Sequence, residues 1–166
     1  MPPSFQHDYE VSIAGLTTAL AAVERDAAAL GFGPATQTKL RLVVEELYTN
    51  VLRHSAGAVG PVRISLQRVA PGQARLQFED GATAFDPFNA TAAAITAAEL
   101  HAPVQDRPVG RLGMVLVRGL AVSATYVRDT GRNCVEVVIT DDDQRPGDTD
   151  GTVVSTDDDR PAGTAG

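Results

Sequence analysis

The sequence has a single cysteine, no tryptophan and a single lysine. The scarcity of cysteine argues against an internal disulfide and against a zinc site. Cys134 has no partner within the chain, so no internal disulfide can form. One thiol and three scattered histidines do not provide the ligand spacing of a zinc site. We expect Cys134 to be a small strand residue in a protein of a reducing, cytoplasmic compartment.

The lack of lysine excludes the commonest phosphate-binding folds. Lys39 is the only lysine, and no glycine-rich phosphate loop precedes it. A P-loop and the usual protein-kinase site both place a lysine on the phosphates, so the sequence excludes both. A dinucleotide-binding fold is disfavoured because no GxGxxG segment follows an early strand.

Long apolar runs and an excess of positive charge are also missing. No stretch approaches the roughly 20 apolar residues that span a membrane, and the amino terminus lacks a signal-peptide pattern. Most of the net charge of −7 lies in 141–166, where eight aspartates stand against two arginines. We expect 141–166 to be an acidic, disordered tail and 1–140 to be one domain. That domain is near neutral, which predicts no direct binding of nucleic acid or an anionic membrane.

What is present predicts an α+β domain. Ser12 is expected to cap a first helix, and Pro34 to begin a second helix that ends near His54. Alternating segments predict two hairpins, with a further helix before the second. Because helices and hairpins segregate, we expect a two-layer sandwich: a mixed, mostly antiparallel sheet with helices on one face. The expected segments are 5–11, 12–30, 34–54, 62–69, 74–79, 111–120, 121–128 and 133–140.

The second expected helix carries the most informative pattern. Glu46, Asn50 and His54 follow one another at intervals of four, so they share one face. Glu46 and Asn50 would lie roughly 6 Å apart along the axis. This face offers a general base and a hard-oxygen metal ligand beside an apolar stripe. The stripe is formed by Leu40, Val43, Val44, Leu47 and Val51.

Other polar residues of the helices have plainer interpretations. Glu45 is expected to be solvated, and His54 to pack at or cap the helix end rather than bind phosphate. Glu24, Arg25 and Asp26 lie opposite the apolar stripe of the first helix, so they are expected at the outer surface.

Two further segments have both a plain and a functional interpretation. Asp80 ends an apolar strand before a small-residue turn, where its carboxylate could accept a hydrogen bond from an amine such as that of adenine. An Asp-Gly turn without a ligand is the commoner origin of this pattern. Gly110 and Gly113 open a helix whose first amides could bind phosphate, although packing glycines explain them equally well.

The order of these segments is more specific than any one of them. Glu46 and Asn50 on a helix, Asp80 at a strand end, and Gly110-x-x-Gly113 opening a helix together resemble the GHKL ATPase superfamily. The stretch from Ser123 to Asn133 is similar to its compact, stand-alone branch, the bacterial anti-sigma-factor serine/threonine kinases. The resemblance covers roughly residues 5–140 and implies the histidine-kinase-like ATPase (Bergerat) fold.

The resemblance implies ATP and Mg²⁺ as cofactors and a role for each matched residue. Asn50 would coordinate the Mg²⁺ that bridges the phosphates, Glu46 would be the general base, and Asp80 would bind the adenine amine. Residues between Asp86 and Val109, an alanine-rich region, would form the lid over the phosphates. The second nucleotide-binding box would comprise Gly110, Arg111, Leu112 and Gly113.

Two positions depart from the family pattern. Ala82 stands where the usual Asp-x-Gly has glycine, and it fits next to the nucleotide only if its backbone does not need a positive φ. Arg111 stands where many relatives have a second glycine, so it could either contact phosphate or crowd the loop.

The resemblance also implies protein partners. An anti-anti-sigma (STAS-type) protein would be the phosphoacceptor, a sigma factor would be held inactive, and a homodimer is a further state that it allows. Because Ala82 and Arg111 are unusual, a non-catalytic, ATP-gated binding module remains an alternative. A degenerate nucleotide site that serves only protein interaction is a third.

Overall fold

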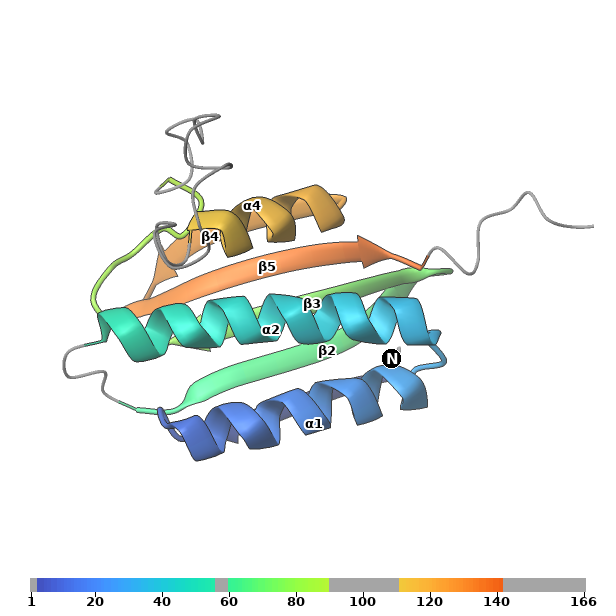
Figure 1. Cartoon of the computed structure of the whole chain (residues 1–166), viewed down its shortest axis with the longest axis horizontal. Coiled ribbons are helices and arrows are strands. Elements are labelled where there is room, and N and C mark those ends of the chain that lie inside the picture. Colours follow the sequence, from blue (N-terminus) through green and yellow to red (C-terminus); the bar gives the residue numbers. More distant parts are fainter. Residues whose placement is uncertain (1–2, 56–59, 90–110, 142–166) are drawn as a thin grey trace, which may run out of the picture.

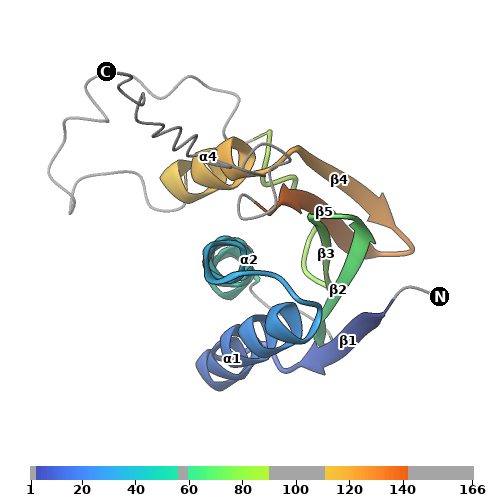
Figure 2. The same cartoon turned by 90° about the vertical axis from the view of Figure 1, so that its right-hand side faces the viewer.

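The computed structural model describes residues 3–55, 60–89 and 111–141, which form an α+β sandwich of two layers (Figure 1). The five-stranded sheet has the order β1-β2-β3-β5-β4, and α1, α2 and α4 all cover the same face (Figure 2). The expected fold class is confirmed. Every neighbouring pair of these strands is antiparallel, where a mixed, mostly antiparallel sheet was expected. The elements are β1 (Ser4–Tyr9), α1 (Ile13–Ala29), α2 (Pro34–His54), β2 (Val62–Ala70), β3 (Gln73–Asp80), α4 (Arg111–Leu120), β4 (Ser123–Asp129) and β5 (Arg132–Thr140).

The helix ends follow the predicted signals. Ser12 is the N-cap of α1, and its hydroxyl accepts a hydrogen bond from the Gly15 amide at 2.9 Å. Gly31, with φ of 79°, turns the chain after α1. Pro34 then begins α2 at a position where its missing amide hydrogen costs nothing.

The core lies between the helices and the sheet, and α2 contributes most of its length to it. The predicted stripe is confirmed, since all five of its apolar residues are buried. Tyr48, which lies outside the predicted stripe, is also fully buried, and its hydroxyl donates to the Glu10 carbonyl. Gly15 of α1 passes so close to both groups that a Cβ there would overlap them. The contact between α1 and α2 therefore requires glycine at this position.

Two acidic residues expected in solvent are buried instead. Asp26 is 3% exposed and lies 2.9 Å from His7 Nε2, so its expected place at the outer surface is wrong. Asp141 is 2% exposed and accepts a hydrogen bond from the Thr36 hydroxyl at 2.8 Å. Hydrogen-bond donors from distant segments reduce the cost of burying these two carboxylates. The composition of the sequence does not reveal such pairs. The folded part therefore includes Asp141, and the remainder of the expected tail, 142–166, lies outside the described residues.

Most of the expected lid also lies outside the described part of the chain, which resumes at Arg111. Asp86 to Asn89 are described and form a turn, in which the Asp86 carboxylate accepts hydrogen bonds from the Phe88 and Asn89 amides. Among the helices of the described ranges, none is long and apolar enough to cross a membrane.

Candidate functional site

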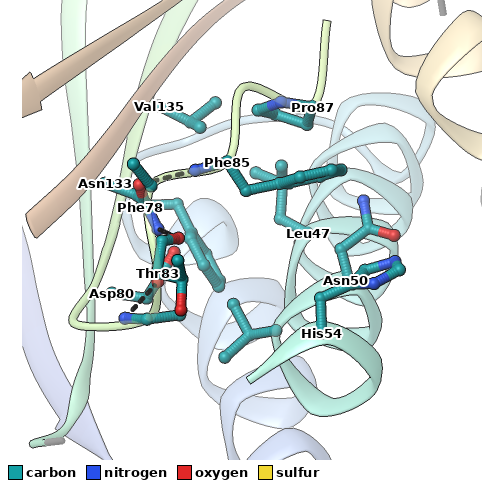
Figure 3. Close-up of a pocket in the computed structure, with 13 residues that line it drawn as sticks. Leu47, Asn50, His54, Phe78, Asp80, Thr83, Phe85, Pro87, Asn133 and Val135 are labelled. Carbon is teal, nitrogen blue, oxygen red and sulfur yellow. Dashed lines mark hydrogen bonds between the residues drawn. The ribbon is translucent and has the colours of Figure 1, made fainter. Parts of the chain in front are cut away.

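A cavity of about 190 Å³ lies between the C-terminal half of α2 and the loop that follows β3 (Figure 3). Three residues predicted as site residues meet here: Asn50 from α2, Asp80 from the end of β3, and Ala82 from the loop. Apolar walls with a few polar groups are typical of a small-molecule site. The other lining residues are Leu47, Val51, His54, Phe78, Thr83, Ala84, Phe85, Pro87, Asn133 and Val135.

Asn50 is a buried amide that faces this cavity. Its side chain lies between Leu47 and Val51 along the helix, both of which also line the cavity. Asn50 is 7% exposed, and no hydrogen bond to its side-chain amide is formed by any residue that the structure describes. Because this side chain lines the cavity, a ligand bound there can form hydrogen bonds with the Asn50 amide.

Asp80 is 6% exposed and held by two donors. Its Oδ1 accepts hydrogen bonds from the Ala82 amide at 2.9 Å and from Asn133 Nδ2 at 2.8 Å. Ala82 has no positive φ; within the described ranges Thr130 is the only residue other than glycine that does. Alanine therefore fits the turn, and this departure from the family pattern leaves the local geometry intact.

Asn133 is a site residue that sequence reasoning missed. It is 3% exposed, lies on β5 directly opposite Asp80 of β3, and donates to that carboxylate. Its role depends on the pairing of β3 with β5, two segments more than fifty residues apart. No local pattern near Asn133 indicates this pairing.

Phe85 and His54 form an aromatic pair at the cavity. Their ring centroids lie 5.1 Å apart with an interplanar angle of 23°, and both side chains line the cavity. Figure 3 shows Phe85 reaching from the loop after β3 across to α2. His54 thus packs at the helix end as expected, whereas the sequence carried no signal for Phe85.

Glu46 lies on the predicted helix face but does not line this cavity. Its carboxylate lies against Gly113 of α4, so closely that a Cβ on Gly113 would overlap it. Burial raises the pKa of the Glu46 carboxyl, the neighbouring Glu45 charge raises it further, and Arg53 opposes both. A raised pKa brings a carboxylate closer to the range that suits a general base at neutral pH. Glu45 itself is exposed, as expected.

The structure locates only part of the expected second box. Gly110 lies outside the described residues, and Arg111 and Leu112 begin α4 with side chains that are not described. Gly113 is placed beside Glu46, so it brings α4 to the acid. The predicted site residues therefore fall into two groups. Asn50, Asp80 and Ala82 line the cavity, whereas Glu46 and Gly113 meet where α2 contacts α4.

The residues present suit a magnesium ion carried by a nucleotide. The described residues contain no group of three or more histidine, cysteine or acidic side chains that could hold a metal. A magnesium ion on phosphates commonly takes only one or two protein ligands. The side-chain oxygen of Asn50 is available for such a role.

Comparisons with known proteins agree with this fold. The profile of the Histidine kinase-like ATPase domain matches residues 10–139. The structure is similar to that of the RsbU and RsbW domains of Rv1364c from Mycobacterium tuberculosis, with a TM-score of 0.58 and 12% identity. That match covers 83% of this chain but only 32% of the Rv1364c chain.

A second similar structure is the SiaB-SiaC complex from Pseudomonas aeruginosa. Its TM-score is 0.50 with 14% identity, over 81% of this chain and 88% of that chain. At these identities the two likenesses establish a shared fold alone. No curated protein matches the sequence.

Proposed function

Because the chain belongs to the histidine kinase-like ATPase domain family, we propose that its cavity binds ATP and that it phosphorylates a serine of a partner protein. The observation that carries this proposal is the meeting of Asn50 and Asp80 in one cavity. These residues come from separate segments, and Asn50 brings an amide oxygen to the cavity where Asp80 brings a carboxylate. An adenine nucleotide needs both chemistries: a magnesium ligand near the phosphates and an acceptor for the exocyclic amine.

The proposed roles follow from what each side chain contacts. Asp80 accepts the adenine amine, and Ala82 lies beside the base. Asn50 would hold a magnesium ion, which when bound neutralises charge on the phosphates. The second box, comprising Gly110, Arg111, Leu112 and Gly113, would face the phosphates with backbone amide groups at the start of α4.

Glu46 is the proposed general base. The serine hydroxyl oxygen of the partner attacks the γ-phosphorus, the bond to the oxygen bridging the β- and γ-phosphates breaks, and ADP leaves. The hydroxyl proton passes to the Glu46 carboxylate. Phosphoryl transfer depends mainly on positioning and charge stabilisation, which a buried helix face and a helix terminus can supply.

The proposed acceptor is an STAS-type anti-anti-sigma protein, and the proposed consequence is control of a sigma factor that the kinase sequesters in the cytoplasm. Family membership and the RsbW domain named in a similar structure support this choice. The SiaB-SiaC complex also pairs a protein of this fold with a second protein.

Phosphotransfer and nucleotide binding can be measured together. The full chain is incubated with Mg-ATP and with STAS-domain proteins encoded near it, and mass spectrometry identifies phosphoserine. Calorimetry with ATP and ADP follows binding in parallel. Phosphoserine on an acceptor supports the kinase. Binding of ATP without transfer would favour a sequestering module, and absence of binding at millimolar ATP would remove both functions.

A further inference from the structure

Asn133 is the centre of a hydrogen-bond network at the end of the cavity nearest Asp80. Its amide is almost completely buried and makes hydrogen bonds to two strands and to the loop after β3. Its Oδ1 accepts from Arg128 Nη1 at 2.7 Å, the Tyr126 hydroxyl at 2.9 Å and the Phe85 amide at 3.3 Å. Its Nδ2 donates to Asp80 Oδ1 at 2.8 Å and to the Thr83 carbonyl at 3.1 Å.

The partners of Asn133 determine which way round its amide lies. A guanidinium such as that of Arg128 can only donate, and so can the backbone amide of Phe85. The Thr83 carbonyl can only accept. An amide in the opposite orientation would set its NH₂ group against two donors and its oxygen against a carbonyl. Asn133 therefore presents its NH₂ group to Asp80.

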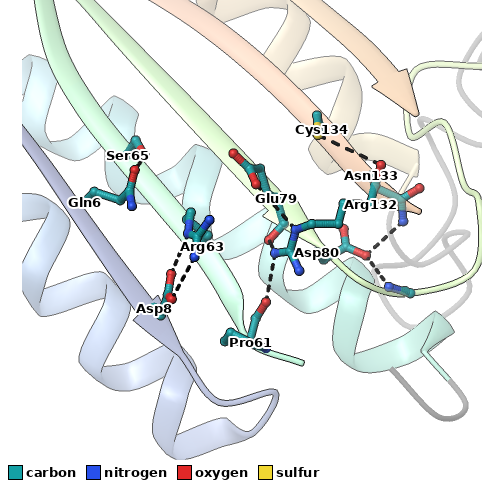
Figure 4. A network of polar contacts seen from close by, with 11 residues as sticks. Gln6, Asp8, Pro61, Arg63, Ser65, Glu79, Asp80, Arg132, Asn133 and Cys134 are labelled. Atoms are coloured by element: carbon teal, nitrogen blue, oxygen red, sulfur yellow. Dashed lines mark hydrogen bonds and ion pairs between the residues drawn. The ribbon is translucent and has the colours of Figure 1, made fainter. Parts of the chain in front are cut away.

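This orientation in turn determines what Asp80 can do. Oδ1 accepts hydrogen bonds from both Asn133 and the Ala82 amide, so the position of this oxygen is fixed. No hydrogen bond reaches Oδ2 from any residue in 3–55, 60–89 or 111–141. The side chain lines the cavity, so Oδ2 is the atom left for a ligand. Figure 4 shows Asp80 held in this way at the end of β3.

We propose that Arg128 and Asn133 are positioning residues that hold the Asp80 carboxylate with Oδ2 directed at the base, and that they thereby select 6-aminopurine over 6-oxopurine nucleotides. This inference rests on the proposed function, in which the cavity takes the nucleotide base. A 6-amino group donates a hydrogen bond to Oδ2. A 6-oxo group brings a second acceptor against a carboxylate, which is unfavourable in a desolvated site.

Arg128 makes this device testable because it lies on β4, outside the cavity lining. Its Nη1 also donates to the Ala82 carbonyl at 2.8 Å, which ties β4 to the turn that carries Asp80. Arg128 is exposed, so its replacement is compatible with folding. Without it, Oδ1 of Asn133 loses its shortest hydrogen bond, and the amide holds Asp80 less firmly.

The experiment compares the dissociation constants of Mg-ATP and Mg-ITP for the full chain by calorimetry. Wild type is expected to prefer ATP by at least about tenfold. Arg128→Met and Asn133→Leu should each reduce this ratio by about tenfold, because Oδ2 of Asp80 is no longer held against the base. Arg128→Lys, which retains a donor, should keep part of the preference. Arg63→Met is the matched control, since Arg63 pairs with Asp8 on the outer face of the sheet and should leave the ratio unchanged (Figure 4).

Thermal unfolding confirms that each variant is folded before its ratio is interpreted. A general loosening of the site would weaken ATP and ITP alike and leave their ratio unchanged. An unchanged ratio in folded Arg128→Met would therefore overturn the inference while wild-type ATP binding upholds the proposed function. If wild type binds neither nucleotide, the proposed function fails and this inference fails with it.

Discussion

The buried polar side chains at the two ends of α2 differ in their hydrogen-bond partners. In its first turn, Thr36 is fully buried and its hydroxyl donates to Asp141, so the chain supplies its own partner. Toward its other end, Asn50 is nearly as buried but faces a cavity, and no described residue hydrogen-bonds its amide. A buried hydrogen-bonded pair contributes to folding, whereas an amide that lines a cavity can form hydrogen bonds with a ligand there. The polar group at the first end thus bonds within the protein, and the one at the second end faces the cavity.

The largest expected effect is on the phosphotransfer rate, and it should differ between the adjacent residues Glu45 and Glu46 of α2. Glu46→Gln should lower phosphotransfer by about 10²- to 10⁴-fold while ATP still binds, because the base is lost and the shape is kept. Glu45→Gln is the matched control, since Glu45 is exposed and should leave the rate nearly unchanged. Single-turnover transfer to the acceptor measures both. Undiminished transfer by Glu46→Gln would contradict the assignment of the base.

A pair of glycines on α4 tests the placement of that base. A Cβ on Gly113 would push the Glu46 carboxylate aside, whereas one on Gly119 meets nothing within 4 Å. Gly113→Ala should lower the transfer rate by up to about 10²-fold, the cost of a misplaced catalytic group. Gly119→Ala should keep the rate and raise helix stability by up to about 1 kcal/mol. Equal rates for the two variants would show that Glu46 does not act from this position.

Asn50→Ala should weaken Mg-ATP binding by about 10- to 100-fold, because it removes the proposed metal ligand. The unfolding midpoint of the unliganded protein should change little, since no hydrogen bond between the Asn50 amide and a described residue is lost with it. Calorimetry with and without Mg²⁺ measures the first effect, and thermal unfolding the second. Equal affinity for Mg-ATP in wild type and variant would remove Asn50 from the site.

The opposite end of α2 should show the reverse pattern. Thr36→Val leaves the buried Asp141 carboxylate without this donor and should lower the free energy of unfolding by about 1–3 kcal/mol. ATP affinity should not change, because Thr36 and Asn50 lie roughly 20 Å apart along the helix. Urea denaturation and the ATP titration give the two values. If Thr36→Val lost as much ATP affinity as Asn50→Ala, the proposed difference between the two ends of α2 would be wrong.

The smallest expected effect is a pH dependence that originates at Glu46. Its pKa is raised in the folded state, by burial first and by Glu45 second. A group with a raised folded pKa stabilises fully below its unfolded pKa, about 4.3 for glutamate, and loses this contribution as pH rises through the folded value. The stability of wild type relative to Glu46→Gln should therefore fall as pH rises above about 4.3. Urea denaturation at a series of pH values measures this difference, and a difference that grows with pH would contradict it.

The fold was predictable because its signals are local. The apolar stripe of α2 repeats with the helical period, Pro34 marks its first residue, and Ser12 caps α1 as expected. The hairpins follow from alternating residues around turn sequences, of which Pro71-Gly72 is the first. Each of these features depends on neighbours within a few positions.

The site was only partly predictable because much of it depends on register and docking. Asn50 and Asp80 stand in recognisable patterns, and they do meet in the cavity. Asn133 reaches Asp80 only because β5 pairs with β3 in one register. The direction of Glu46 depends on where α4 docks. Neither the strand register nor the docking of α4 can be inferred from the residues next to Asn133 or Glu46.

The most direct test is a crystal structure of the full chain with Mg²⁺ and a non-hydrolysable ATP analogue. We expect the adenine amine within hydrogen-bond distance of Asp80 Oδ2 and the magnesium ion coordinated by the side-chain oxygen of Asn50. A nucleotide bound elsewhere, or a cavity between α2 and the loop after β3 that stays empty at saturating analogue, would contradict it.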